Sequence, residues 1–209
     1  STYCRNDCSF CHFRNSNKKL VRYRKNEVEI IEAAKQLAST GVHLIDLTMG
    51  EDPEILHPDF GLKRLLNLVK KVRSETGLPI MISPGALPES AVMQLADANV
   101  DWFACYQETH SRSLFNKLRC GQSYDMRMNV KLGAKRSGMF IEEGILTGVG
   151  ETLDDIADSI EAMRSIGADQ VRAMTFVPQK GTPMESVSPL DSKLEQVIIS
   201  VKRLVLPGA

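Results

Sequence analysis

The sequence predicts an α/β protein built as an incomplete (β/α) barrel of the TIM type. Short runs rich in β-branched and apolar residues recur along the chain, and longer segments with apolar residues at helical spacing separate them. Strands that are joined through helices pair in parallel by right-handed crossovers. Because no Gly-rich fingerprint follows the first strand, a barrel is favoured over an open dinucleotide-binding sheet.

Five strands are predicted, at residues 43–48, 79–83, 102–106, 139–146 and 170–177. A barrel of this type has eight strands, so we expect the chain to be a fragment that lacks the first strand and the last two. No linker interrupts the pattern, and residues 1–209 are therefore predicted to form a single core domain.

Helices are predicted between the strands, at residues 28–37, 62–69, 92–96 and 156–163, with a last helix at 192–204. Two pairs of residues have the pattern of an N-cap and its N3 partner, Asn26 with Glu29 and Thr152 with Asp155. Gly41 and Gly77 lie where the first two helices are expected to end, since glycine readily adopts the left-handed conformation found there.

The charge balance argues against two kinds of partner. The 209 residues include 26 basic and 26 acidic side chains, which removes the usual electrostatic reason to bind nucleic acid or an anionic membrane. No apolar run approaches the roughly 18 residues of a membrane-spanning helix. We therefore expect neither nucleic acid nor a membrane as a partner.

The five cysteines are unevenly placed, because Cys4, Cys8 and Cys11 crowd into one short stretch while Cys105 and Cys120 stand alone. An odd number with this spacing is a poor disulfide framework. Chemistry that needs reduced thiols is the better interpretation, and it predicts a reducing compartment, the cytoplasm. The two isolated cysteines are expected to be small buried apolar residues.

The C-x3-C-x2-C run of Cys4, Cys8 and Cys11 lies in a polar segment without helical or strand periodicity. Three thiolates on so short a loop can hold an iron–sulfur cluster, and a cluster with three cysteine ligands keeps one iron open for a small molecule. The alternative is a structural zinc site with His12 or a remote residue as the fourth ligand. Zinc modules usually space cysteines in paired C-x2-C knuckles, and a second pair is missing, so residues 1–14 are predicted to be a cluster-binding loop.

With Phe10 before the third cysteine, this motif resembles that of the radical S-adenosylmethionine (SAM) enzymes. In that family, three cysteines hold a [4Fe-4S] cluster whose open iron chelates the amino and carboxylate groups of SAM. An electron from a donor such as flavodoxin or ferredoxin passes through the cluster and cleaves SAM to a 5'-deoxyadenosyl radical. The resemblance implies a full or partial barrel, with the cluster loop after its first strand, and places Phe10 near the adenine.

Four further strings resemble the branch of this family that includes biotin synthase and the E-type hydrogenase maturase, and within it the methylornithine synthases of pyrrolysine biosynthesis. The strings are DLTMGEDP at 46–53, ISPG at 82–85, YQET at 106–109 and MTF at 174–176. They agree in order and spacing, and the likeness runs from residue 1 to about residue 206.

Gly50 and Glu51 follow a predicted strand end, where the active sites of barrels collect. They resemble the Gly-Gly-Glu loop of the family, which receives the ammonium of SAM, although Met49 stands in place of the first glycine. The alternative is a plain strand-to-helix turn.

Ser83 and Glu108 end the next two strands, and Arg127 is expected on the helix that follows. A carboxylate and a guanidinium suit the two charges of an amino-acid cofactor. By resemblance, Ser83 belongs to the same cofactor site, and Glu108 and Arg127 grip the aminocarboxypropyl end of SAM. The residues alone favour the alternative, a salt bridge between Glu108 and Arg127.

The string Gly144-x-Leu146-x-Gly148-x-x-Glu151 resembles the adenine-contacting motif of the family. The resemblance assigns Leu146 and Gly148 to the adenine. The alternative is that the glycines only shape a turn and that Glu151 favours the N-terminus of the next helix.

Asp46 and Arg172 lie inside or at the end of strands that are expected to be buried. Removing the partner of a buried charge costs on the order of 3 to 5 kcal/mol, so both should face opposite charges at the barrel mouth. The resemblance implies that Asp46 binds the ammonium and Arg172 the carboxylate of an amino-acid substrate. The alternative is an ion pair between the two residues, without a ligand.

The resemblance thus implies a radical SAM isomerase that converts L-lysine to (3R)-3-methyl-D-ornithine, and no general acid or base is assigned. A sibling enzyme of the biotin-synthase or maturase type is the first alternative. A biotin synthase would need ligands for a second cluster, for which only Cys105 and Cys120 are available. An alternative of another class is a small iron–sulfur electron carrier or a zinc-stabilised binding module, which would not need charged residues at its strand ends.

Overall fold

The computed structural model describes residues 1–188 and 193–209, which form two compact units. The first unit comprises Ser1–Arg5, Arg22–Cys105 and Asn129–Phe140, and the second comprises Asn6–Val21, Tyr106–Met128 and Ile141–Ala209. Neither unit is continuous in sequence. The segment before the first helix, where the cysteine motif lies, therefore contributes to both.

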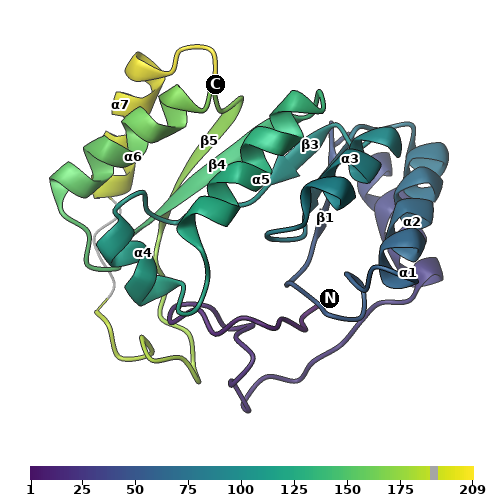
Figure 1. Cartoon of the computed structure of the whole chain (residues 1–209), viewed down its shortest axis with the longest axis horizontal. Coiled ribbons are helices and arrows are strands. Elements are labelled where there is room, and N and C mark those ends of the chain that lie inside the picture. Colours follow the sequence, from purple (N-terminus) through teal and green to yellow (C-terminus); the bar gives the residue numbers. More distant parts are fainter. Residues whose placement is uncertain (189–192) are drawn as a thin grey trace. The chain divides into compact units, whose positions relative to one another are not determined.

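The first unit contains three parallel strands and the helices that connect them (Figure 1). The elements are α1 (Glu27–Ser39), β1 (Ile45–Thr48), α2 (Gly61–Thr76), β2 (Ile80–Ser83), α3 (Glu89–Asp97) and β3 (Trp102–Ala104). Strand β2 pairs with β1 on one side and with β3 on the other, and Thr48 and Ser83 are cross-strand neighbours at the carboxyl end. Helix α1 packs against α2 and β1.

The second unit contains a parallel pair of strands with helices packed against it. Its elements are α4 (Arg112–Leu118), β4 (Phe140–Thr147), α6 (Leu153–Ser165), β5 (Gln170–Thr175) and α7 (Lys193–Val205). Strands β4 and β5 are in register from the pair Glu142–Gln170 to the pair Thr147–Thr175. Helix α7 packs against β5 and α6. Helix α5 (Tyr124–Arg136) and the first residue of β4 are shared between the units.

The five predicted strands are confirmed, each with slightly narrower or shifted bounds. Both predicted capping boxes are present, because Asn26 and Thr152 accept hydrogen bonds from the N3 backbone of α1 and α6 and receive the reciprocal carboxylate contact. Gly77 ends α2 in the left-handed conformation, with φ of 68°. The start of the last predicted helix, Ser192, lies outside the described residues.

Strand β2 shows why the apolar runs of this sequence form parallel strands. Ile80, Met81 and Ile82 are all at most 2% exposed, so the strand is covered on both faces, as in sheets that helices flank. Strand β4 departs from this pattern, since Glu142 and Glu143 lie in its middle and are both 0% exposed. Buried carboxylates need partners inside the fold, and these partners lead to the candidate site.

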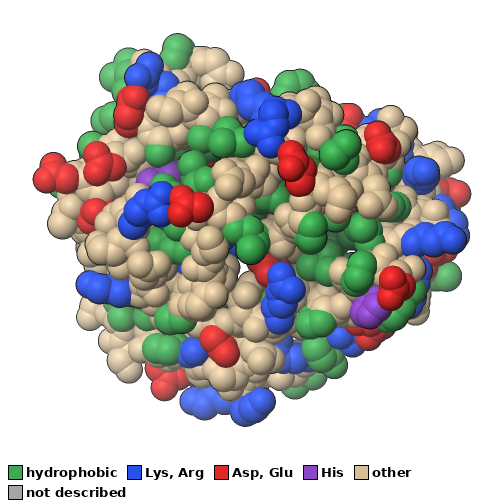
Figure 2. All heavy atoms as spheres, viewed as in Figure 1, with side chains coloured by type: hydrophobic (Ala, Val, Ile, Leu, Met, Phe, Trp, Pro, Cys, Tyr) green, Lys and Arg blue, Asp and Glu red, His purple; other side chains and the backbone are tan. Residues whose placement is uncertain are grey.

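On the face shown in Figure 2, acidic and basic side chains are interspersed, so this face has no large patch of one charge. Within the described ranges, no helix is long and apolar enough to cross a membrane.

Lys202 on α7 is a buried cation at 2% exposure, and its Nζ has no hydrogen-bond partner among the residues that the structure describes. Burial lowers the pKa of Lys202 from 10.5 to about 8, and Glu195 opposes this only in part. We expect Lys202→Met to stabilise the fold by roughly 1 to 3 kcal/mol at pH 7, because it removes the cost of burying an ammonium.

The pH dependence provides the check on this prediction. The unfolded state binds the Lys202 proton more tightly, so wild-type stability should rise as the pH goes from about 8 to 10.5, and the advantage of Met should shrink over that window. Urea unfolding at several pH values measures both effects. Lys70→Met, at an exposed position of α2, is the control and should change stability by less than about 0.5 kcal/mol. A Lys202→Met variant no more stable than wild type at pH 7 would contradict the assignment.

Candidate active site

The cysteine motif lies in a segment without regular secondary structure, which backbone hydrogen bonds hold in place. Cys4 belongs to the first unit, where the neighbouring Arg5 N donates to the Glu51 carbonyl at 3.0 Å. Cys8 and Cys11 belong to the second unit, where Ser9 N donates to the Leu118 carbonyl at 2.8 Å. The loop is thus anchored close to each of its thiols.

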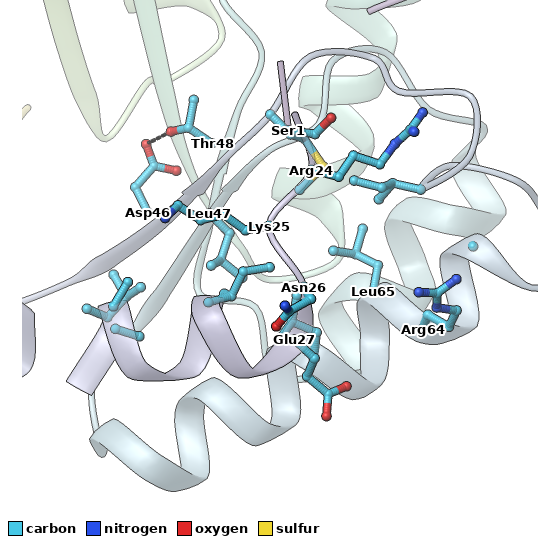
Figure 3. Close-up of a pocket in the computed structure, with 18 of the residues that line it drawn as sticks. Ser1, Arg24, Lys25, Asn26, Glu27, Asp46, Leu47, Thr48, Arg64 and Leu65 are labelled. Carbon is cyan, nitrogen blue, oxygen red and sulfur yellow. Dashed lines mark hydrogen bonds between the residues drawn. The ribbon is translucent and has the colours of Figure 1, made fainter. Parts of the chain in front are cut away.

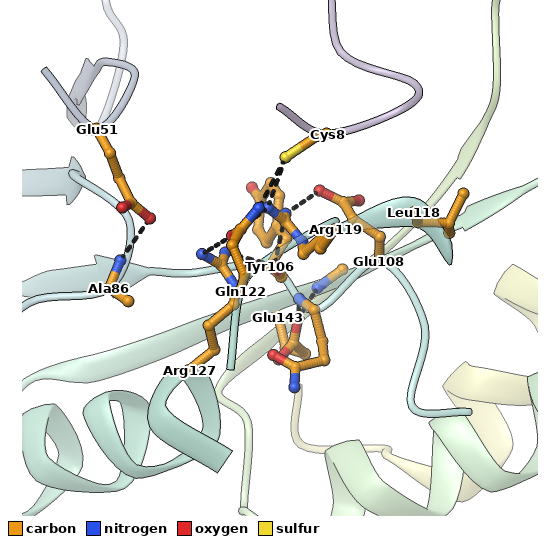
Figure 4. Close-up of polar contacts among 12 residues, drawn as sticks. Cys8, Glu51, Ala86, Tyr106, Glu108, Leu118, Arg119, Gln122, Arg127 and Glu143 are labelled. Carbon is orange, nitrogen blue, oxygen red and sulfur yellow. Dashed lines mark hydrogen bonds and ion pairs between the residues drawn. The ribbon is translucent and has the colours of Figure 1, made fainter. Parts of the chain in front are cut away.

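The chemistry of this loop fits an iron–sulfur cluster. Cys8 is buried at 6% exposure, and its Sγ accepts hydrogen bonds from Gln122 Nε2 at 3.0 Å and from Arg119 Nη1 at 3.6 Å (Figure 4). Such donors stabilise a sulfur that carries negative charge, as a metal-bound thiolate does. No group of three or more His, Cys, Asp or Glu side chains in the described parts of the chain is already gathered to hold a metal ion. The ligand set Cys4, Cys8 and Cys11 stays a prediction.

In the first unit, the loop after β1 depends on two glycines. A Cβ on Gly50 would lie 2.3 Å from the Tyr3 carbonyl oxygen, so only glycine allows this close approach. Glu51 is 6% exposed, and its carboxylate accepts hydrogen bonds from Ala86 N at 3.0 Å and Arg5 Nε at 3.1 Å. Its side chain lies directly over Gly85, where a Cβ would come within 2.2 Å of Glu51 Cγ. The structure therefore joins two strings, at 46–53 and 82–85, that the sequence presents separately.

Asp46 and Ser83 meet near the ends of β1 and β2. Ser83 Oγ donates to Asp46 Oδ1 at 3.2 Å, and Thr48 Oγ1 donates to Asp46 Oδ2 at 2.6 Å. Asp46 also lines a pocket of about 460 Å³ between α1, β1 and α2, where Figure 3 shows its hydrogen bond to Thr48. The prediction that Asp46 is a buried charge is wrong, because the side chain is exposed and two hydroxyl groups orient it.

In the second unit, the buried acid Glu108 pairs with Arg119. Its Oε1 accepts a hydrogen bond from Arg119 Nη2 at 2.6 Å, and both side chains are less than 10% exposed. Burial raises the pKa of Glu108, and the guanidinium groups of Arg119 and Arg127 oppose that shift. The ion pair that the structure shows for Glu108 is thus with Arg119, and the charge of Arg127 acts on the same carboxylate. Arg119 is the C-cap residue of α4, and nothing in the sequence pattern marked it beyond its basic side chain near a helix terminus.

Arg127 lies on α5, the second of two helices after Glu108, whereas a single helix was predicted there. It is 4% exposed, donating from Nη2 to the Tyr106 carbonyl at 2.7 Å and from Nη1 to Gln122 Oε1 at 3.2 Å. Figure 4 shows Arg119, Gln122 and Arg127 converging around Tyr106. Glu108 and Arg127, the residues of this unit that are predicted to bind the aminocarboxypropyl end of SAM, therefore belong to one buried polar cluster.

Glu108 itself has an unusual backbone, with φ of 68°. A non-glycine residue in this region costs of order 1 kcal/mol or more, and it persists only when its surroundings hold it there. Here Glu108 N donates to the Gly144 carbonyl at 3.1 Å, and Leu146 N donates to the Glu108 carbonyl at 2.9 Å. These two bonds to β4 hold the backbone of Glu108 in this conformation.

The residues predicted to contact adenine also come together in the second unit. Phe10 and Leu146 pack against an apolar cluster of Leu114, Leu118, Val149 and Phe176. Beside it, Gly148 N and Val149 N donate to the carboxylate of Glu151 at 2.7 and 2.9 Å. Glu151 directly precedes Thr152, the N-cap of α6, so its carboxylate is bonded within the loop while it lies next to the helix N-terminus.

Arg172 on β5 pairs with Glu142 of β4. Glu142 is fully buried, and its Oε1 also accepts a hydrogen bond from the Tyr106 hydroxyl at 2.6 Å. The side chain of Arg172 is 46% exposed, so the prediction of a buried charge is wrong here as well. Glu142 is not among the residues predicted from the sequence, although an acid inside an apolar strand run indicates a buried charge with a partner.

The isolated cysteines differ from each other. Cys105 is 2% exposed, as predicted for a small apolar residue. Cys120 is exposed, so the prediction of burial is wrong for it, and its Sγ lies 3.4 Å from the Lys117 carbonyl.

Residues 1–163 match the Radical SAM superfamily, and the chain belongs to this superfamily. The cofactors predicted from the cysteine motif, a [4Fe-4S] cluster and SAM, are those that the superfamily uses. The match covers the cluster loop and every predicted cofactor residue.

More specific likenesses lie within the superfamily. The chain is 44% identical over 208 residues to the 3-methylornithine synthase of Methanosarcina acetivorans, covering 99% of this chain and 58% of that protein. It is 30% identical over 210 residues to the [FeFe] hydrogenase maturase subunit HydE of Thermotoga maritima, covering 100% of this chain and 59% of that one. A crystal structure of methylornithine synthase (PylB) matches with a TM-score of 0.93 and 43% identity, covering 100% of this chain and 60% of that chain. The predicted radical SAM type of α/β barrel fold is confirmed, and the chain spans somewhat less than two thirds of these relatives.

We predict that Gly85→Ala destabilises the chain more than Gly41→Ala does. Both glycines have φ of +82°, so both substitutions incur roughly 1 to 2 kcal/mol of left-handed strain. A Cβ at position 41 meets nothing within 4 Å, whereas at position 85 it collides with Glu51, which should add about 1 to 3 kcal/mol.

Urea unfolding of both variants, and of Gly85→Ala in a Glu51→Ala background, measures this collision. With the longer side chain removed, the cost of Gly85→Ala should fall toward that of Gly41→Ala. Equal costs for the two glycines in the wild-type background would show that Glu51 does not lie over Gly85.

Proposed function

We propose that the protein to which this chain belongs is a radical SAM isomerase that converts L-lysine to (3R)-3-methyl-D-ornithine. The observation that carries the proposal is the 44% identity to a 3-methylornithine synthase over 99% of the chain. It is supported by two charged side chains at strand positions, Asp46 and Arg172, whose signs suit the ammonium and carboxylate of an amino acid.

In this proposal, Cys4, Cys8 and Cys11 hold the [4Fe-4S] cluster. When bound, the cluster and SAM together supply the 5'-deoxyadenosyl radical that abstracts hydrogen from the lysine side chain. The buried carboxylates of Glu51 and Glu108 suit the ammonium of SAM, and the guanidinium of Arg127 suits its carboxylate. Gly50 and Ser83 complete this end of the site.

The adenine of SAM is proposed to lie against Phe10, Leu146 and Gly148. Phe10 and Leu146 are partly buried side chains at the edge of one apolar cluster, which offers a surface for a flat ring. The glycine leaves the backbone beside them open to close approach.

For the substrate, Asp46 is proposed to bind the ammonium of lysine and Arg172 its carboxylate. Both side chains are exposed, and each is oriented by a neighbouring residue. The hydroxyls of Thr48 and Ser83 donate to Asp46, and Glu142 pairs with Arg172. Catalysis in such a site is largely positioning, because the reactive groups come from the cofactors. The chain's own residues hold the fragments of the carbon skeleton close together, and none is assigned as a general acid or base.

We further propose that a small electron carrier such as flavodoxin or ferredoxin reduces the cluster and that the protein works in the cytoplasm. Three cysteines committed to a cluster need a reducing compartment. Neither nucleic acid nor a membrane is proposed as a partner.

A second candidate is a sibling reaction on another substrate, because the chain is also 30% identical to HydE over 210 residues. Such an enzyme would use the same cofactor residues. It would differ in what Asp46 and Arg172 contact.

Incubation of the reduced, cluster-reconstituted full-length protein with SAM and L-lysine tests the proposal. We expect 5'-deoxyadenosine and methylornithine together. Cys8→Ala should lose both the cluster absorption and the products, whereas Cys120→Ala, at an exposed position outside the motif, should keep them. Deoxyadenosine without methylornithine would favour the sibling reaction. A protein that contains zinc in place of iron and sulfide, and cleaves no SAM, would contradict the radical SAM chemistry altogether.

Arg172→Ala should weaken lysine binding by about 2 to 5 kcal/mol while the iron and sulfide content stays at the wild-type level. The substitution removes the carboxylate partner but touches none of the predicted cluster ligands. Calorimetric titration with lysine in the presence of SAM measures the loss. Arg164→Ala is the matched control, since Arg164 pairs on the surface of α6 with Glu161. Unchanged lysine affinity in Arg172→Ala would remove this residue from the substrate site.

A further inference from the structure

Two side chains outside the cysteine motif donate hydrogen bonds to one of its sulfurs. Gln122 Nε2 lies 3.0 Å from Cys8 Sγ, and Arg119 Nη1 lies 3.6 Å from the same atom. Cys8 and Arg119 are both less than 9% exposed, so water contributes little to this environment. All three residues belong to the second unit.

The orientation of the Gln122 amide follows from its other contacts. Its Oε1 accepts hydrogen bonds from Arg127 Nη1 at 3.2 Å and from Arg119 Nη1 at 3.5 Å. Guanidinium groups only donate, so the oxygen of the amide must face them. The NH₂ group of Gln122 must then face the sulfur, and Cys8 must be the acceptor.

The backbone fixes these donors in place. Gln122 N donates to the Arg119 carbonyl at 3.0 Å, closing the turn between α4 and α5. Gly121 adopts φ of 74° within that turn. The Leu118 carbonyl, one residue before Arg119, accepts from Ser9 N, one residue after Cys8, at 2.8 Å. The turn and the cysteine loop are thus fastened together beside the sulfur.

We propose that Gln122 and Arg119 are positioning residues that raise the reduction potential of the cluster through hydrogen bonds to Cys8. The inference rests on the proposed function, because it requires Cys8 to be a cluster ligand. Reduction by one electron makes a cluster more negative, and donors to its sulfurs stabilise that extra charge.

The same two residues also link the cluster ligand to the proposed SAM-binding residues. Arg119 donates to Glu108 Oε1 at 2.6 Å as well as to Cys8, and the oxygen of Gln122 is held by Arg127. The two side chains therefore connect the redox centre directly to the groups that grip the cofactor.

The test is the midpoint potential of the one-electron couple between the 2+ and 1+ states of the cluster. It is measured by EPR-monitored titration with dithionite and oxidant on the full-length, reconstituted protein without SAM. Gln122→Met removes the donor at nearly constant size, and Gln122→Glu keeps the acceptor for the two arginines but turns an oxygen toward the sulfur. We expect reduction to become at least tenfold less favourable in both variants, which is a shift of about 59 mV to more negative potential.

Gln94→Met is the matched control, because Gln94 is an exposed glutamine on α3 that donates to the Ser90 carbonyl. Its potential should equal that of wild type. Potentials of both Gln122 variants equal to the control would overturn the inference while leaving the cluster assignment intact. A wild-type protein that assembles no iron–sulfur cluster would instead overturn the proposed function.

If neither Gln122 variant assembles a cluster, the wild-type protein itself decides the question. Resonance Raman spectra in H₂O and D₂O should differ in the iron–cysteine stretching bands, because exchangeable N–H groups contact Cys8. Bands that do not move on exchange would overturn the inference.

Discussion

Charged side chains buried in the second unit constrain everything around them. Glu108, Arg119, Arg127, Glu142 and Glu143 are all less than 9% exposed. Groups buried in this way destabilise the fold by several kcal/mol unless partners inside it compensate them. Arg119 contributes to this compensation in two segments, since it donates to Glu108 and the Tyr106 carbonyl after β3 and to Cys8 in the cysteine loop. One guanidinium therefore fixes a strand end and the cysteine loop relative to the end of α4.

The first unit also contains a buried carboxylate, which is compensated in a different way. Glu51 is buried, but its carboxylate is bonded to the backbone of Ala86 and to the half-exposed Arg5. This arrangement needs two positions without a Cβ, Gly50 against Tyr3 and Gly85 under Glu51. A glycine at such positions is required by close contacts and not only by turn geometry. This explains why the short strings after β1 and β2 are specific signals for this site.

The sequence could predict the strands and the caps because these depend on local pattern. Apolar runs such as 79–83 have few alternatives to a buried strand, and the capping boxes need only residues three apart. The ion-pair partner of Arg172 could not be predicted in this way, because it depends on the register between β4 and β5. Gly144 is the cross-strand neighbour of Arg172, which places Glu142, two residues earlier on β4, on the same face. The role of Arg119 could not be predicted either, because a basic residue at a helix end is usually solvated.

The pairing of Glu142 with Arg172 bears on how a substrate carboxylate would be held. A guanidinium carries five N–H donors in a planar fork, so it can contact a buried carboxylate on one side and a ligand on the other. The side chain of Glu142 has no exposed surface, whereas that of Arg172 is 46% exposed, so the arginine is the member of the pair that a ligand can reach. In the proposed reaction this geometry separates two tasks, since Glu142 sets the direction of the arginine and Arg172 makes the contact. A lysine at position 172 would keep the charge but lose the fork, and with it the ability to perform both tasks in fixed geometry.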